Sequence, residues 1–324
     1  MSDTVTSGRA ATAVRPAGPK PPGRRRGKTD WRAIGAFALL IAPMVIGLGV
    51  FKYITIGWSF LLSFSEARGT IDIGEWVGLD NYLYLLQNEA FQKSMSGIIL
   101  FTIFIVPVTF GFSLAIAVLL HGMSKGKAFF RTSFLIPAAV SYVVASLIWK
   151  MSLFNGMPSG VANTIGGIFG WDVISWIAGV DPPLYWIVIV TLRLWLQVGL
   201  YMILFLAGLQ AIPVSLYEAA SLDGASRWAQ FRFITLPMLR NTSVAILMLI
   251  LIGAFQAFDE FYNLFTTTQG NSTAPVRPPL VYLYDTALKG QDYGTGSAGA
   301  FLLTLLIVVV TLLQGRFVGF GRKD

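Results

Sequence analysis

The stretch IILFTIFIVPVTFGFSLAIAVLL, residues 98–120, contains no charged side chain. Because a transmembrane α-helix needs about 20 mainly apolar residues, this stretch predicts a helix that crosses a lipid bilayer. The whole chain has the same character: of its 324 residues, 55% are hydrophobic and 12% are charged, and the mean hydropathy is +0.66. This composition excludes a cytosolic two-domain enzyme and a largely disordered chain.

Five further stretches repeat this apolar pattern, and together they predict an all-α polytopic membrane protein with six transmembrane helices. The expected spans cover about residues 34–62, 98–120, 133–153, 184–209, 244–265 and 297–313. They make up one membrane domain, residues 33–320. The preceding residues 1–32 are basic and rich in Ala, Pro, Gly, Ser and Thr, which indicates a disordered tail.

The basic residues decide the expected orientation, because cytoplasmic loops carry an excess of Lys and Arg. With six spans, 17 of the 24 Lys and Arg residues fall on the side of the two termini, and four fall on the opposite side. A seventh span at Gly160–Val180 would spoil this asymmetry, so we interpret that glycine-rich segment as interfacial. Both termini are therefore expected in the cytoplasm, and the net charge of +8 reflects topology and not nucleic-acid binding.

The residue inventory argues against several kinds of catalytic site. The chain has no cysteine, hence no disulfide, thiolate nucleophile or iron–sulfur cluster. Its one histidine, His121, cannot form a histidine-based metal site. No pair of carboxylates and no Ser/His arrangement falls at membrane depth. We therefore expect no catalytic residue and no metal site in this chain.

The longest loop between two spans on the cytoplasmic side, residues 210–241, contains the most informative motif. Residues 217–237 read YEAASLDGASRWAQFRFITLP. Asp223-Gly224 predicts the end of a first helix, since Gly readily adopts a left-handed conformation, and Ser226 is a suitable N-cap for a second helix that reaches Thr235. Such an elbow suits docking to another protein. The aromatic residues of its second helix would equally suit a helix on the membrane surface, and composition leaves both interpretations open.

The motif resembles the EAA motif of ABC importer permeases. The residues that carry this resemblance are Glu218-Ala219-Ala220, Asp223-Gly224-Ala225, Phe231, Ile234 and Leu236-Pro237. Other segments are similar to the carbohydrate-uptake branch, which includes the maltose and glycerol-phosphate permeases: Gly78–Tyr82, Phe130-Arg131-Thr132 with Pro137 and Ile148-Trp149-Lys150, and Gly208-Leu209 with Ile212-Pro213. The resemblance covers about residues 34–320 and implies the fold of a type I ABC importer permease.

The resemblance also implies a division of labour between subunits. The loop 210–241 would be a coupling helix seated in a cleft of a separate ATPase subunit, and its coupling residues would be Glu218, Ala219, Ala220, Asp223, Gly224, Ala225, Phe231 and Pro237. ATP and magnesium would bind to that ATPase, and this chain would bind no cofactor. The chain contains no Gly-x-x-x-x-Gly-Lys-Ser/Thr loop to hold nucleotide.

The partners and the cargo implied by the resemblance follow the same scheme. They are a second homologous permease in a heterodimer, two ATP-binding subunits, an extracytoplasmic sugar-binding protein and the lipid bilayer. The location would be the plasma membrane of a prokaryote. The cargo would be a sugar or related polyol, and the residues leave a monosaccharide, a disaccharide, an oligosaccharide and a polyol phosphate open.

Polar side chains inside the fourth and fifth spans indicate a substrate path, since ionisable groups in a membrane are costly and are often functional. Residues spaced to share one face of each helix are Arg193, Gln197 and Tyr201 on the fourth span and Gln256, Asp259 and Asn263 on the fifth. Such faces could hold an uncharged sugar by hydrogen bonds and aromatic stacking. Arg193 could equally have a purely structural role and form an ion pair with Asp259 or Glu260.

Two other classes of protein are compatible with six apolar spans. A single-chain secondary transporter or channel would tolerate the buried charges, but the sequence shows no convincing internal repeat, and such a protein would not need the motif at residues 217–237. A membrane enzyme would need a catalytic arrangement at membrane depth, and none is apparent in the sequence.

Overall fold

The computed structural model describes residues 31–178, 183–265 and 277–318. Within these ranges the chain is built from helices without a β-sheet, and the only extended pairings are two isolated bridges, Ser65–Trp76 and Arg68–Asp292. The predicted all-α fold is confirmed. Apart from its last two residues, the expected tail 1–32 lies outside the described residues.

The chain divides into two units between Ile54 and Thr55. The first unit contains α1 (Trp31–Leu48) and the π-helical segment η1 (Gly49–Ile54). The second unit begins with α2 (Thr55–Leu62) and contains the rest of the described chain. The helical segment Ile34–Leu62 is apolar and long enough to cross a membrane, in agreement with the pattern expected for residues 34–62.

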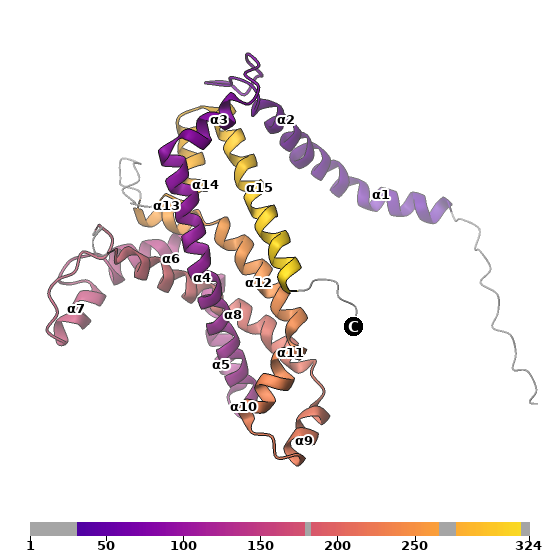
Figure 1. Ribbon diagram of the computed structural model, residues 1–324, viewed down its shortest axis with the longest axis vertical. Coiled ribbons are helices and arrows are strands. Elements are labelled where there is room, and N and C mark those ends of the chain that lie inside the picture. Colours follow the sequence, from indigo (N-terminus) through magenta and orange to yellow (C-terminus); the bar gives the residue numbers. More distant parts are fainter. Residues whose placement is uncertain (1–30, 179–182, 266–276, 319–324) are drawn as a thin grey trace, which may run out of the picture. The chain divides into compact units, whose positions relative to one another are not determined.

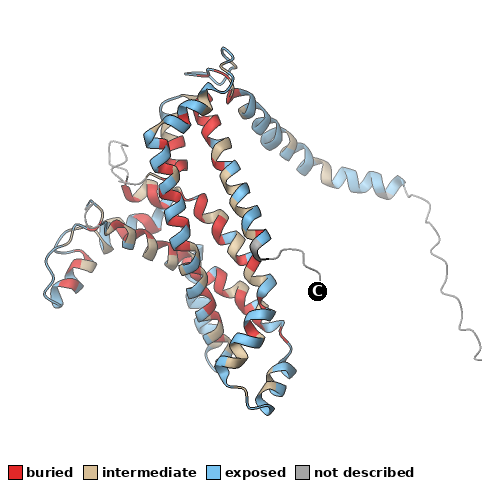
Figure 2. Cartoon of the chain, in the orientation of Figure 1, coloured by how far each residue is buried: buried red, intermediate tan, exposed pale blue. Residues whose placement is uncertain are grey.

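The second unit is organised around α4 (Glu89–Gly122), α8 (Tyr185–Gln210), α12 (Arg240–Phe255) and α15 (Tyr293–Val318). Among the described residues, five helical segments are long and apolar enough to span a membrane, and a sixth results if one bent pair is counted as a single span. Helices α4, α8 and α12 pack on one another, and their buried residues form the centre of the bundle (Figures 1 and 2).

The third expected span, residues 133–153, is not one straight helix. It consists of α5 (Lys127–Leu135), the 3₁₀ turn η2 (Ile136–Ala139), α6 (Tyr142–Ile148) and the π-helical segment η3 (Trp149–Leu153), and the two halves meet at an angle of 95°. Pro137 has no N–H to donate within a helix, and the Ser141 hydroxyl accepts a hydrogen bond from the Val143 N–H, which starts the new helix.

The segment Gly160–Val180 contains only one short helix, α7 (Val161–Ile168), among its described residues. Eight residues rise about 12 Å, far less than the thickness of a bilayer core, so α7 cannot cross the membrane. The buried Asn163 amide fixes the chain that follows, because it donates to the Ile174 carbonyl and accepts from the Ile174 N–H and the Trp176 indole. The loop therefore has a defined shape of its own.

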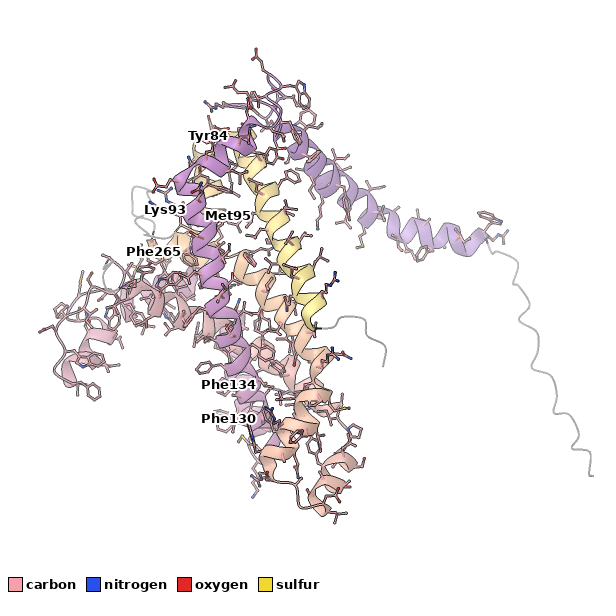
Figure 3. All side chains as sticks on the ribbon, viewed as in Figure 1. Tyr84, Lys93, Met95, Phe130, Phe134 and Phe265 are labelled. Atoms are coloured by element: carbon pink, nitrogen blue, oxygen red, sulfur yellow. The ribbon has the colours of Figure 1, made fainter. Side chains whose placement is uncertain are left out.

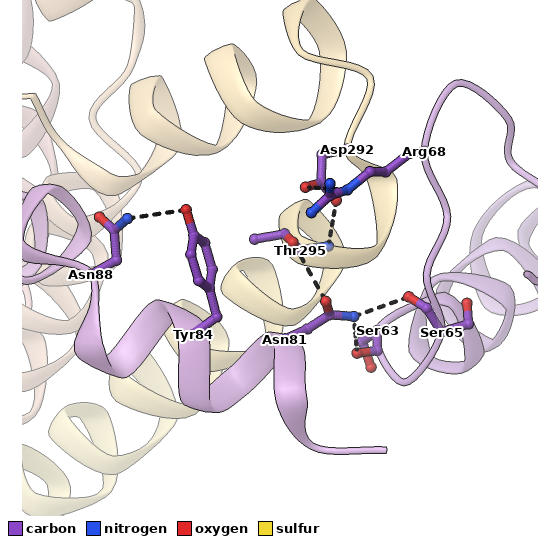
Figure 4. Close-up of polar contacts among 8 residues, drawn as sticks. All are labelled: Ser63, Ser65, Arg68, Asn81, Tyr84, Asn88, Asp292 and Thr295. Atoms are coloured by element: carbon purple, nitrogen blue, oxygen red, sulfur yellow. Dashed lines mark hydrogen bonds and ion pairs between the residues drawn. The ribbon is translucent and has the colours of Figure 1, made fainter. Parts of the chain in front are cut away.

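A small polar network closes the end of the bundle where α3 (Asp80–Gln87) meets the start of α15 (Figure 4). The Asn81 amide donates to the carbonyls of Ser63 and Ser65 at 3.0 Å each, and Arg68 pairs with Asp292 at 3.3 Å. Two further short elements, α14 (Pro279–Leu283) and η5 (Tyr284–Lys289), pack against α15. The network joins segments that are more than 200 residues apart in the sequence.

The crossing of α8 with the chain around α5 depends on Gly199. A Cβ atom at Gly199 would lie 1.8 Å from the carbonyl oxygen of Phe134, a residue whose ring is labelled in Figure 3. Real carbon and oxygen atoms cannot approach so closely, so the two backbones pack together only because residue 199 has no side chain.

We predict that Gly199→Ala destabilises the helix bundle. The new methyl group meets a backbone atom that cannot rotate away, and overpacking of this kind typically costs about 1–3 kcal/mol. The matched control is Gly111→Ala on α4, where a Cβ meets no heavy atom within 4 Å. Thermal unfolding in detergent should show a lower midpoint for Gly199→Ala alone, and equal midpoints for both variants would contradict this role.

Candidate functional site

The loop between α8 and α12 folds as the expected elbow. Its first arm is α9 (Val214–Leu222), which follows Pro213, and its second arm is formed by α10 (Arg227–Gln230) and the π-helical segment η4 (Phe231–Thr235). The short α11 (Leu236–Met238) then leads into α12. The Ser226 hydroxyl accepts a hydrogen bond from the Ala229 N–H at 3.2 Å, so Ser226 caps the second arm.

The turn between the arms is closed by backbone hydrogen bonds. Gly224 has a φ of +78°, a value that residues with a Cβ rarely adopt. The Gly224 N–H donates to the Ser221 carbonyl at 3.1 Å, and the Ala225 N–H donates to the Ala220 carbonyl at 2.9 Å. This pair of bonds is the Schellman ending of a helix, and it satisfies two carbonyls that the end of α9 would otherwise leave free.

Side chains brace the two arms against each other. The hydroxyls of Tyr217 and Thr235 lie 2.9 Å apart, and the Gln230 amide donates to the Ser221 hydroxyl at 3.0 Å and to the Ala225 carbonyl at 3.2 Å. The elbow therefore has a fixed angle at its turn and near its base.

The motif residues divide into an exposed tip and a packed base. No residue of α9 is buried, so Glu218, Ala219 and Ala220 are all accessible. Asp223 and Gly224 at the turn are exposed as well. On the second arm, Phe231 and Ile234 pack against the bundle core, whereas Trp228 remains 67% exposed. Pro237 lies inside α11, which ends at Met238, and Leu239 separates α11 from α12.

A second polar feature lies where the fifth span is interrupted. Helix α12 ends at Phe255, and α13 (Asp259–Phe265) begins after three non-helical residues. In a continuous helix the Ala257 N–H would donate to the Gly253 carbonyl; here it donates to the Ala254 carbonyl at 3.2 Å. The Gly253 carbonyl therefore needs another donor inside the bundle.

Arg193 on α8 supplies that donor. Arg193 is 2% exposed. Its guanidinium donates to the Gly253 carbonyl and to the buried Glu260 carboxylate. Its centre also lies 5.3 Å from the centroid of the Phe101 ring on α4. One cation thus satisfies the free end of α12, pairs with the first turn of α13 and packs on α4.

Gln197, one helical turn along α8, extends this cluster. Its side-chain oxygen accepts from the Arg193 Nε at 3.3 Å, and its amide donates to the Tyr142 hydroxyl on α6 at 2.7 Å. Arg193 and Gln197 share a face of α8, as the spacing predicted. No sequence signal pointed to Tyr142, because nothing in the periodicity of residues 184–209 relates that helix to α6.

The expected polar face of the fifth span does not form as one stripe. Gln256 and Asp259 are exposed, and the break between them removes the regular helical spacing on which that expectation relied. Asn263 donates to the Asp259 carbonyl of its own helix and accepts, through its backbone carbonyl, a bond from the Lys150 ammonium at 3.3 Å. Tyr201 is 6% exposed and packs in the apolar core.

Aromatic rings that could stack on a ligand gather near the break. Phe258 and Tyr262 are stacked with their ring centroids 5.2 Å apart at 13°, and Tyr284 of η5 lies 5.4 Å from Phe258 and 5.3 Å from Tyr262. All three rings are half-buried. Among the described residues, no group of three or more His, Asp or Glu side chains could hold a metal ion.

Comparisons with known proteins place this architecture in a family. Residues 108–319 match the family model described as "Binding-protein-dependent transport system inner membrane component". The chain is 34% identical to the arabinooligosaccharides transport system permease protein AraP of Bacillus subtilis, over 87% of this chain and 90% of the relative. It is 32% identical to the trehalose/maltose transport system permease protein MalF of Thermococcus litoralis, over 92% and 98%.

A solved structure shows the same fold. A chain of a bacterial alginate ABC transporter, determined in complex with an alginate pentasaccharide-bound periplasmic protein, superposes with a TM-score of 0.77 over 90% of this chain and 98% of that one, at 22% identity. The elbow, the broken spans and the apolar helices therefore belong to a multi-pass membrane permease. The family match and the identities over most of the chain show that this protein belongs to the family of binding-protein-dependent transport system inner membrane components.

Proposed function

We propose that this chain is the membrane subunit of an ATP-driven importer that translocates a sugar or related polyol. An extracytoplasmic binding protein would deliver the cargo, and separate ATPase subunits would hydrolyse ATP with magnesium. A second, homologous permease would complete the membrane part as a heterodimer, with both termini of this chain in the cytoplasm. The names of AraP and MalF, which refer to oligosaccharide and disaccharide transport, support a carbohydrate cargo.

The observation that carries the proposal is the exposed, braced elbow. Helix α9 buries none of its residues, yet the hydroxyls of Tyr217 and Thr235 and the Gln230 amide tie its two arms into one unit. A rigid element with small side chains at its tip suits a cleft in another protein, because Ala219 and Ala220 allow close backbone approach. The Glu218 carboxylate would pair with a basic residue of the ATPase.

The elbow, where the proposed ATPase would dock, continues directly along the chain into the helices that carry the polar cluster. Its first arm follows α8, and its second arm runs through α11 into α12. Arg193 of α8 bonds Gly253 of α12 and Glu260 of α13. A movement of the elbow would therefore act on both sides of this cluster at once, where alternating access would have to open and close the path.

The residues around the proposed path fall into three roles. We assign Arg193 with Glu260 to holding the interrupted span together, because the Arg193 guanidinium donates both to the Glu260 carboxylate and to the Gly253 carbonyl. Gln197, Gln256, Asp259 and Asn263 keep polar groups near the break, beside the partly exposed rings of Phe258, Tyr262 and Tyr284. These side chains would hydrogen-bond and stack on a sugar. Tyr201 would shape the wall from the core.

We predict that Gly224→Val and Glu218→Ala uncouple transport from ATP hydrolysis. Valine in the left-handed conformation costs roughly 1–2 kcal/mol and distorts the turn. The matched control is Gly170→Val, which imposes the same backbone strain at φ +78° outside the elbow, in a site with no atom within 4 Å of the new Cβ. The measurement is stimulation of ATPase activity by loaded binding protein in reconstituted transporter. Equal stimulation in Gly224→Val and Gly170→Val would refute the coupling assignment.

We also predict that Arg193→Met lowers the yield of folded protein. Removal of one partner leaves a buried carboxylate and a carbonyl unpaired, which typically costs about 3–5 kcal/mol. The double variant Arg193→Met/Glu260→Met removes both charges and should recover part of the lost stability. If Arg193→Met instead assembled at the wild-type yield and failed only in uptake, Arg193 would belong to the path.

A third prediction concerns Gln197. Gln197→Ala removes the hydrogen bonds to Arg193 and Tyr142 and should reduce uptake or change sugar preference while basal ATP hydrolysis persists. The loss of one hydrogen bond to a bound sugar costs roughly 1 kcal/mol, a several-fold change in affinity. Gln210→Ala, at the exposed end of the same helix, is the control. Uptake and selectivity equal to wild type in Gln197→Ala would remove this residue from the path.

A further inference from the structure

A cavity lies at the opposite end of the bundle from α3, between the end of α4 and the elbow. It has a volume of about 610 Å³. Its walls come from the last turn of α4, from Leu209 of α8, from α9 and from the second arm of the elbow, and its polar side chains include His121, Tyr217, Arg227 and Gln230. The path proposed above uses none of these side chains.

The charged and polar groups of this cavity are positive or neutral. Arg227 lines it, and within the described part of the chain this guanidinium has no ion pair or side-chain hydrogen bond. The His121 Nδ1 is buried without a hydrogen-bond partner among the described residues. The Lys127 ammonium lies close by, since it donates to the His121 carbonyl at 3.2 Å.

Among the described residues, no carboxylate lines this cavity. The acidic residues of the loop, Glu218 and Asp223, lie on α9 and at its end, and neither lines the cavity. The Gln230 amide is already used by Ser221 and Ala225, and the Tyr217 hydroxyl by Thr235. An anion with several acceptor oxygens would pair with Arg227 and lie beside His121, and a phosphate group has this chemistry.

The remaining wall of the cavity is apolar. Val118, Leu119 and Leu209 come from the ends of α4 and α8, which are membrane-length helices. The cavity therefore combines basic groups with an apolar side at the boundary of the membrane domain. Basic pockets at the ends of transmembrane helices suit anionic lipid headgroups, and the same basic groups suit a soluble phosphate.

We propose that this cavity binds a phosphate group through Arg227 and His121, carried either by an anionic phospholipid or by a soluble phosphate compound. Bound there, the anion contacts the second arm through Arg227 and the last turn of α4 through His121, so it holds the elbow in place against α4. The site is separate from the proposed sugar path and places a regulatory ligand at the base of the proposed coupling element.

The test uses the full-length chain purified in detergent and two probes. Retention of phosphatidylglycerol against phosphatidylcholine is counted by native mass spectrometry, and binding of radiolabelled inorganic phosphate is measured at equilibrium. Arg227→Gln and His121→Gln alter side chains at the cavity. Arg232→Gln is the control, because it removes the same charge from an exposed position on the same arm, outside the cavity.

We expect wild type and Arg232→Gln to retain phosphatidylglycerol in preference to phosphatidylcholine, and Arg227→Gln to bind about tenfold more weakly, as the loss of a charge-assisted hydrogen bond implies. His121→Gln should show a smaller loss in the same direction. Displacement of the lipid by millimolar inorganic phosphate, with the same dependence on Arg227, assigns the site to soluble phosphates; lack of displacement assigns it to lipid. Equal binding in wild type and Arg227→Gln, or an equal loss in Arg232→Gln, would overturn the proposal.

Discussion

The guanidinium of Arg193 holds the centre of this permease together. The fifth span is interrupted after Phe255, and inside a membrane the freed Gly253 carbonyl has no water to accept from. Arg193 donates to that carbonyl and to Glu260 on the other side of the break. Taking these charges out of water is costly, and only the complete set of hydrogen bonds offsets that cost.

This arrangement permits a break in a place where a membrane helix would normally be continuous. The break exposes the polar side chains of Gln256 and Asp259 and brings the ring of Phe258 beside Tyr262. In a continuous helix the backbone N–H and C=O groups would bond to one another. A sugar could then hydrogen-bond only to side chains on the helix surface. The third span is also broken, at Ser141, which places Tyr142 within reach of Gln197.

The elbow and the polar cluster are connected through α8 and α12. Pro213 separates α8 from α9 on one side, and α11 connects the second arm to α12 on the other. The tip is exposed, whereas the base is fixed by Tyr217 and Thr235. A force applied at the tip by a docked partner would reach α8 and α12 before any other span, and an anion in the cavity beside Arg227 would resist the same displacement.

The sequence alone determined the features that depend on local chemistry. Apolar runs predicted the membrane helices, and Asp223-Gly224 with Ser226 predicted the elbow, because helix ends are decided by neighbouring residues. The presence of a charged residue within an apolar span singled out Arg193 as a structural or functional residue. The tertiary structure decided three further features. They are the pairing of Arg193 with Glu260 instead of Asp259, the hydrogen bond between Gln197 and Tyr142, and the 95° bend after Pro137. Which side chains from distant helices meet depends on how the helix backbones cross. That crossing depends on contacts between distant residues, such as Gly199 against Phe134, and no local sequence pattern encodes such a contact.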